Sequence, residues 1–246
     1  AVYPGKALTR NWPNNGPNML WRKRDIGAAK TGVVVAKGKL ILFHEVNRYD
    51  VIECLQADTG KTIWKNNYAS NFVPGYGSAA GPRATPVITG DRVYTMGGQG
   101  ILVCTDMVTG KTVWKIDTQK TYRASDGFFG MACSPLVEGY AVLLNIGGEA
   151  GAGIVAIHKD TGKLLWKTLD DEASYSSPVM ATLLGKRRAV FFTRTGLVVV
   201  DPVTGKIDFK NRWRARIHAS VNAAAPMVAG GRIFVTSSYK LSLIHI

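Results

Sequence analysis

The sequence predicts an all-β protein built from repeated four-stranded units. A Thr-Gly turn followed by a short apolar strand occurs four times, and the turn glycines, spaced 50, 52 and 43 residues apart, are Gly60, Gly110, Gly162 and Gly205. A proline lies 24 or 27 residues before each of the last three glycines, at Pro86, Pro135 and Pro178. No stretch of a dozen residues shows the 3.6-residue apolar period of a helix.

Each repeat contains the same elements in the same order. A strand follows the proline, a β-branched or aromatic run such as residues 91–95 comes next, and a third apolar run such as residues 101–105 leads to the Thr-Gly turn. Glycine supplies the positive φ that this turn needs. The last strand contains an aromatic residue, in chain order Trp64, Trp114, Trp166 and Phe209.

Four short strands in a unit of this length are typical of a β-propeller blade. The spacing predicts four full blades, at residues 31–67, 82–118, 131–169 and 174–212, and Pro226 opens an incomplete fifth. A single sheet cannot bury both of its faces, so we expect each tryptophan to pack against the neighbouring blade. Four and a half blades predict an open arc of a larger, seven- or eight-bladed ring.

The domain organisation follows from these repeats. Residues 1–30 form an N-terminal segment, in which Met19-Leu20-Trp21 matches the end of a repeat and predicts the strand that closes the ring. Residues 31–240 form the propeller repeats as one incomplete domain. Residues 241–246 differ from every repeat, and we interpret them as a non-native tail without function. The strands that partner the segment around Trp21 are then expected in further C-terminal blades of the same protein.

Composition bounds the possible functions. The chain has 246 residues and a formal net charge of +14, but its basic residues are scattered, so no nucleic-acid partner is expected. Its longest apolar stretches, such as residues 197–200, are far shorter than a membrane-spanning helix needs, so the chain is not expected to be transmembrane. Three cysteines, at Cys54, Cys104 and Cys133, form no Cys-x-x-Cys pair and predict buried free thiols.

Common catalytic motifs are absent from the sequence. Gly60-Lys61-Thr62 resembles the end of a phosphate-binding loop, but Leu55 stands where that loop needs a glycine. The glycines at 147–153 lead into a strand, which argues against a dinucleotide-binding turn. His44-Glu45 is followed by Arg48 where a zinc-binding motif needs a second histidine. No catalytic residue is assigned.

The repeat resembles a known family. The succession of a small residue, proline, strands and Asp-x-x-Thr-Gly-Lys-x-x-Trp is similar to the pyrroloquinoline-quinone-like (PQQ-like) β-propeller repeat. The opening, from Trp12-Pro13 to Trp21, resembles secreted bacterial members that are similar to the outer-membrane assembly lipoprotein BamB. The resemblance implies a periplasmic or secreted protein. It also implies a non-catalytic scaffold in the bacterial cell envelope that binds a protein or polymer partner.

Two alternatives remain open. The family also contains PQQ-dependent quinoprotein oxidoreductases, which bind PQQ and Ca²⁺ and often carry a disulfide between adjacent cysteines. This chain has no adjacent cysteines, and most of its acidic residues fall in turns, so no cofactor or metal is expected outside that alternative. The second alternative is a carbohydrate- or small-molecule-binding sensor module, suggested by the long insertion at residues 121–130.

Candidate ligand-facing residues come from two places. Residues just before the repeat proline are expected to line the channel or its rim, and the insertion is expected near the same face. These candidates are Arg83, Arg123, Asp126, Phe128, Phe129, Ser134, Ser176, Ser177 and Asn222.

Overall fold

A computed structural model describes residues 14, 16–75, 79–218, 220–239 and 243–245. The prediction of an all-β propeller is confirmed: four antiparallel sheets have four strands each, and a fifth sheet has three. In every sheet the strands pair in chain order. We call these sheets blades 1 to 5.

The strands of the blades are bounded as follows. Blade 1 contains β1 (Val34–Ala36), β2 (Lys39–Val46), β3 (Tyr49–Gln56) and β4 (Thr62–Ala69), and blade 2 contains β5 (Val87–Thr89), β6 (Arg92–Met96), β7 (Ile101–Asp106) and β8 (Thr112–Asp117). Blade 3 contains β9 (Leu136–Glu138), β10 (Ala141–Asn145), β11 (Ile154–His158) and β12 (Leu164–Thr168), and blade 4 contains β13 (Val179–Leu183), β14 (Lys186–Phe192), β15 (Gly196–Val200) and β16 (Ile207–Arg212). Blade 5 contains β17 (Met227–Ala229), β18 (Arg232–Thr236) and β19 (Leu243–His245).

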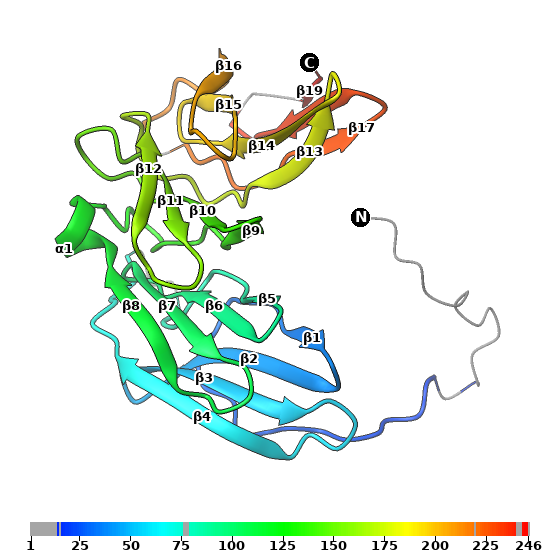
Figure 1. Cartoon of the computed structure of the whole chain (residues 1–246). Helices are drawn as coiled ribbons and strands as arrows, with labels where there is room; N and C mark the ends of the chain where they lie inside the picture. Colours follow the sequence, from blue (N-terminus) through cyan, green and yellow to red (C-terminus); the bar gives the residue numbers. More distant parts are fainter. Residues whose placement is uncertain (1–13, 15, 76–78, 219, 240–242, 246) are drawn as a thin grey trace.

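The blades follow one another around an open arc (Figure 1). The first strand of each blade, from β1 to β17, lies on the inner side of the arc, and β4, β8, β12 and β16 lie on the outer side. Strand direction gives the arc two faces. We call the face where each innermost strand begins the entry face, and the opposite face, which carries the first hairpin turns and the Thr-Gly turns, the turn face.

The core of the protein lies between consecutive blades. Ile41, Phe43 and Ile52 of blade 1 pack with Val93 and Val103 of blade 2, and similar clusters join blades 2 and 3, 3 and 4, and 4 and 5. The middle strands are therefore covered on both faces, which explains why runs such as β15 are apolar without alternation.

The repeated tryptophan docks each blade onto the next, as the repeat predicted. The indole N–H of Trp114 donates to the carbonyl of Lys159 at 2.8 Å, and its ring lies against Gly162. Gly162 has φ of +70°, and a Cβ there would lie 3.0 Å from the indole, so both the turn and the ring require glycine. Trp64 and Trp166 make the same contact with Gly110 and Gly205.

Three local features differ from or extend the expectations. Thr118–Tyr122 forms a short helix, α1, capped by Asp117, whose side chain accepts from the amide of Lys120. The strand expected around Trp21 is not formed, yet Trp21 donates to the carbonyl of Ala57 at 3.0 Å and its ring contacts Gly60. Its ring-closing role stays a prediction.

In the tail, β19 pairs with β18 as the third strand of blade 5. Trp12 and Pro13 lie outside the described residues.

Candidate functional site

Loops that join and belong to blades 2 to 5 line a cavity on the entry face. Its volume is about 450 Å³. The β8–β9 loop, the β12–β13 loop, the β14–β15 hairpin and the β16–β17 loop supply its lining: Ser125, Asp126, Gly127, Phe128, Gly130, Glu172, Ala173, Ser174, Tyr175, Arg194 and His218. We take this cavity as the candidate site, because the predicted insertion forms one of its walls.

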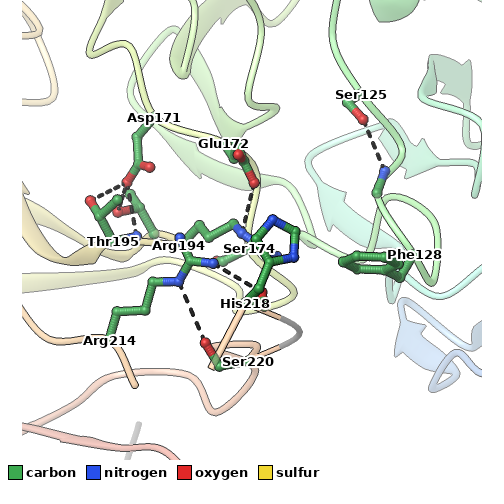
Figure 2. A network of polar contacts seen from close by, with 12 residues as sticks. Ser125, Phe128, Asp171, Glu172, Ser174, Arg194, Thr195, Arg214, His218 and Ser220 are labelled. Atoms are coloured by element: carbon green, nitrogen blue, oxygen red, sulfur yellow. Dashed lines mark hydrogen bonds and ion pairs between the residues drawn. The ribbon is translucent and has the colours of Figure 1, made fainter. Parts of the chain in front are cut away.

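Arg194 is the charged centre of the cavity wall (Figure 2). Only 6% of Arg194 is exposed. Its Nε lies 2.7 Å from a carboxylate oxygen of Glu172, and its Nη2 donates to the carbonyl of His218 at 2.9 Å. Its guanidinium carbon lies 5.8 Å from the centre of the Phe128 ring, within the range of a cation–π contact. The cavity therefore presents one paired cation beside an aromatic ring.

A buried carboxylate holds the hairpin that carries Arg194. One oxygen of Asp171 accepts from the hydroxyl of Thr193 and from both the amide and the hydroxyl of Thr195, the latter two at 3.1 and 2.6 Å. Figure 2 shows Asp171 and Thr195 beside Arg194. Because three donors converge on this oxygen, Asp171 positions Arg194 and does not itself face a ligand.

Tyr175 fastens the insertion to the β12–β13 loop. Its hydroxyl oxygen accepts from the backbone amides of Phe128 and Phe129, at 3.0 and 3.2 Å. The rings of Tyr175 and Phe129 meet edge to face with centroids 5.5 Å apart. These contacts fix the wall of the cavity that carries Asp126 and Phe128.

Arg83 connects the insertion to the loops of blades 1 and 2. Its guanidinium donates to the carbonyls of Phe129, Gly81 and Ala79, and its carbon lies 4.5 Å from the centre of the Phe72 ring. Burial lowers the pKa of Arg83 from its ordinary value, and nearby carboxylates partly offset that effect. Arg83, which was predicted to face a ligand, thus lies on the entry face. Its N–H groups donate to carbonyls of the β4–β5 loop and of the insertion.

The predicted serines connect one blade to the next around the inner side of the arc. The amide of Gly32 donates to the hydroxyl oxygen of Thr85, the amide of Thr85 to Ser134, and the amide of Ser134 to Ser177, at 2.9 to 3.0 Å. All four positions directly precede the repeat proline or its counterpart, Val33. Their hydroxyls therefore hold neighbouring innermost strands in register.

Three further predicted residues do not line the cavity: two are buried and one is exposed. Asn222 is buried, and its amide group donates to the carbonyls of Thr193 and Trp213. Ser176 is also buried and donates to the carbonyl of Ala224. Arg123 is exposed beyond α1 and pairs with Glu149 at 3.2 Å.

Asp126 and Phe128 line the cavity, so the structure brings these two predicted residues together. The sequence did not identify Arg194, Glu172, Tyr175 or His218 as cavity residues. Each lies in a loop whose sequence does not repeat between blades. The one available signal was a charged residue in the hairpin turn at 193–196.

The donor set does not fit a calcium–quinone centre. Ca²⁺ takes six to eight oxygen ligands, often from several carboxylates. Here Asp171 is engaged by two threonines and Glu172 by Arg194, which leaves Asp126. In the described part of the chain, no three His, Cys, Asp or Glu side chains converge to hold a metal.

None of the three cysteines lines the cavity. Cys54, Cys104 and Cys133 are buried free thiols, as the sequence predicted. Burial raises the pKa of Cys104 and of Cys133 to about 12, so both stay protonated and unreactive at neutral pH.

Comparison with known proteins identifies the family. The family model described as outer membrane protein assembly factor BamB matches residues 48–243. The chain belongs to this family. The match runs from the second half of blade 1 into blade 5, which agrees with the PQQ-like repeat recognised in the sequence.

Relatives of two kinds share this fold. Quinoprotein alcohol dehydrogenase PedH of Pseudomonas putida is 29% identical over 133 residues, 52% of this chain and 21% of that protein. BamB from Moraxella catarrhalis is 16% identical with a TM-score of 0.55, over 89% of this chain and 58% of that one. Quinohemoprotein alcohol dehydrogenase from Comamonas testosteroni is 17% identical with a TM-score of 0.57, over 86% and 40%. The two structural likenesses show the fold.

The chain spans less than two thirds of the length of each of these proteins. Among the described residues, no helix has the length and apolar character that crossing a bilayer requires.

Proposed function

We propose that this chain belongs to a non-catalytic β-propeller of the bacterial cell envelope that binds a protein or polymer partner through its entry face. The observation that carries the proposal is the linkage of loops from all of the first four blades. Arg83 and Tyr175 tie these loops to one another, and Arg194 is held beneath them. A surface ordered in advance binds at a lower entropic cost than one that must order on contact.

The carboxylates of the cavity favour binding over catalysis. A general acid or base must reach its substrate with a proton to give or accept. Asp171 and Glu172 are already engaged, and among the described residues Asp126 forms no hydrogen bond with His218 or with a serine of the lining. The match to PedH favours an oxidoreductase as a second candidate, but the donor set described above does not support it.

A small-molecule or carbohydrate ligand is favoured by one observation. Phe128 offers a ring face at the cavity, with Asp126 and Arg194 beside it. Aromatic stacking combined with a carboxylate suits a sugar hydroxyl pair, and the volume of about 450 Å³ matches a small ligand.

The test compares the wild-type chain with Asp126→Ala/Phe128→Ala and with a turn-face control, Asp58→Ala. Proteins retained from a bacterial envelope extract are identified, purified and titrated against each variant. We expect the entry-face variant to weaken binding at least about tenfold and the control to leave it unchanged. In parallel, PQQ with Ca²⁺ is titrated by calorimetry and absorbance. Micromolar one-to-one binding of PQQ would overturn the non-catalytic proposal, and saturable binding of a monosaccharide would favour the small-molecule candidate.

A further inference from the structure

One repeated position on the turn face changes in blade 3. In blades 2 and 4 an arginine at the start of the second strand pairs with the turn aspartate: Arg92 with Asp106 at 2.7 Å and Arg188 with Asp201 at 3.1 Å. In blade 1 the equivalent Lys39 reaches the carbonyl of Met107 in blade 2. Thus a long basic side chain fills this corner in three of the four full blades.

Blade 3 has Ala141 and His158 at these two positions. They pair across β10 and β11 as Arg92 and Asp106 pair across β6 and β7. Because alanine leaves the corner empty, a hollow of about 1030 Å³ opens between blades 3 and 4. The corresponding corner between blades 2 and 3 holds about 260 Å³. A departure from the repeat has therefore produced the cavity.

The walls of the hollow are aromatic and aliphatic. Tyr140 is 71% exposed, and its ring stacks on His158 with centroids 6.1 Å apart and 15° between the planes. Leu165 and Val203 also line the hollow, and 81% of Val203 is exposed. Leu184, at the tip of the β13–β14 hairpin, is fully exposed nearby. Exposed apolar side chains gathered in this way are typical of an interaction surface.

The rim of the hollow is basic. Arg187 makes a two-pronged ion pair with Glu138, at 2.9 and 3.0 Å, and ties blade 4 to blade 3. Lys159 lies over the Tyr140 ring at 5.4 Å, and Lys186 lines the hollow. Among the described residues neither lysine has a carboxylate partner. The rim thus carries positive charge that its own acids do not neutralise.

We propose that this turn-face hollow binds an extended acidic peptide segment of a partner protein. An aromatic or branched aliphatic side chain of the peptide enters between Tyr140 and Val203, and carboxylates on either side of it meet Lys159 and Lys186. A peptide fits better than a compact small molecule, because the exposed Leu184, which is not part of the lining, adds apolar surface beyond the hollow itself. The inference rests on the proposed function only in treating the chain as a binding protein, since the two surfaces lie on opposite faces.

The decisive variant restores the repeat. Ala141→Arg/His158→Asp gives blade 3 the pair found in blades 2 and 4, which fills the hollow with a side chain that the fold already accommodates twice. The matched control is Lys39→Arg/Gln56→Asp, which creates the same pair in blade 1, where the corner is already filled. Both variants are expected to unfold as cooperatively as the wild-type chain, so a loss of binding can be assigned to the hollow.

The probe is a phage-displayed random dodecapeptide library selected on the 246-residue chain. We expect enriched peptides to combine an aromatic or branched aliphatic residue with acidic neighbours. Fluorescence anisotropy should show them bound at least about tenfold more weakly by Ala141→Arg/His158→Asp and unchanged by the control. Lys159→Glu/Lys186→Glu should weaken binding and reduce its dependence on salt.

Several results would overturn the inference. One is a set of enriched peptides that bind the filled variant as well as the wild-type chain. Another is loss of binding only in Asp126→Ala/Phe128→Ala, which would support the entry-face proposal and remove this one. A shift from dimer to monomer in the filled variant would identify a second copy of the chain as the occupant. Failure to enrich any acidic peptide would also refute the inference, and the entry-face experiment would remain valid.

Discussion

Replacing Asp50 by Asn should change how the stability of this protein depends on pH. Asp50 begins the buried part of β3, and its side chain has no exposed surface. Burial raises the pKa of Asp50 from 3.8 to about 7. Glu45 adds to the rise, whereas the hydroxyls of Tyr68 and Ser70 and the charge of Arg83 reduce it. A side chain at Gly97 would lie 2.5 Å from an Asp50 oxygen, so the pocket around the carboxyl is closed.

The sign of the effect follows from the two pKa values. Well below pH 4 Asp50 is protonated in both states, and it costs no stability. Between pH 4 and 7 the unfolded chain ionises while the folded chain keeps its proton, so stability falls with rising pH. At 1.36 kcal/mol per pKa unit, the full loss above pH 7 is about 4 kcal/mol. Asp50→Asn keeps the shape and carries no charge, so it should not show this loss.

Urea unfolding followed by tryptophan fluorescence, from pH 4 to pH 8, measures the difference. We expect Asp50→Asn and the wild-type chain to have similar unfolding free energies at pH 4. At pH 8 the variant should be more stable by a few kcal/mol. Asp58→Asn, at an exposed turn position, serves as the control and should follow the wild-type curve. Parallel curves for Asp50→Asn and the wild-type chain would refute the reasoning.

Three further predictions concern the blade contacts, the insertion and the thiols. Trp114→Ala should destabilise the chain by about 3–5 kcal/mol, and Trp114→Phe by about 1–2 kcal/mol, because phenylalanine keeps a ring on Gly162 and loses the bond to Lys159. Equal urea midpoints for the two variants would contradict this. Tyr175→Phe should speed hydrogen exchange at the amides of Phe128 and Phe129, which lose their acceptor, and unchanged exchange would show that the loop is held otherwise. Cys104 and Cys133 should resist alkylation in the folded chain at pH 8 and react fully in urea, and rapid labelling without urea would disprove their burial.

The predictability of this fold from sequence has a physical basis. The Trp–Gly contact recurs from blade to blade, so the amino-acid sequence alone assigns Trp64, Trp114 and Trp166 to the same role. The serines could be placed on the entry face for the same reason. Their hydrogen bonds to preceding blades could not be predicted, because they depend on how closely two innermost strands approach.

The candidate site was predicted less completely than the fold. Asp126 and Phe128 were identified from the length of the insertion that carries them. Arg194 and Tyr175 were missed because their partners, Glu172 and the amides of the insertion, come from different loops that share no repeat. Arg83 was expected to face a ligand, but three carbonyls from two loops accept its protons. Contacts between non-repeating loops leave no periodic trace in the sequence.

Trp21 shows that the docking contact between blades and the pairing of the fourth strand are independent features of the repeat. Its indole donates to Ala57 and its ring lies on Gly60, as Trp64 does with Met107 and Gly110, although no strand forms around Trp21. Docking between blades therefore needs the tryptophan, the glycine and a turn carbonyl, and it does not need the pairing of a fourth strand. A residue that all copies of the repeat share, such as the turn glycine, is one that this docking requires. A position that one copy changes, such as Ala141 opposite His158, is free of that constraint, and it is there that the repeat leaves room for a partner.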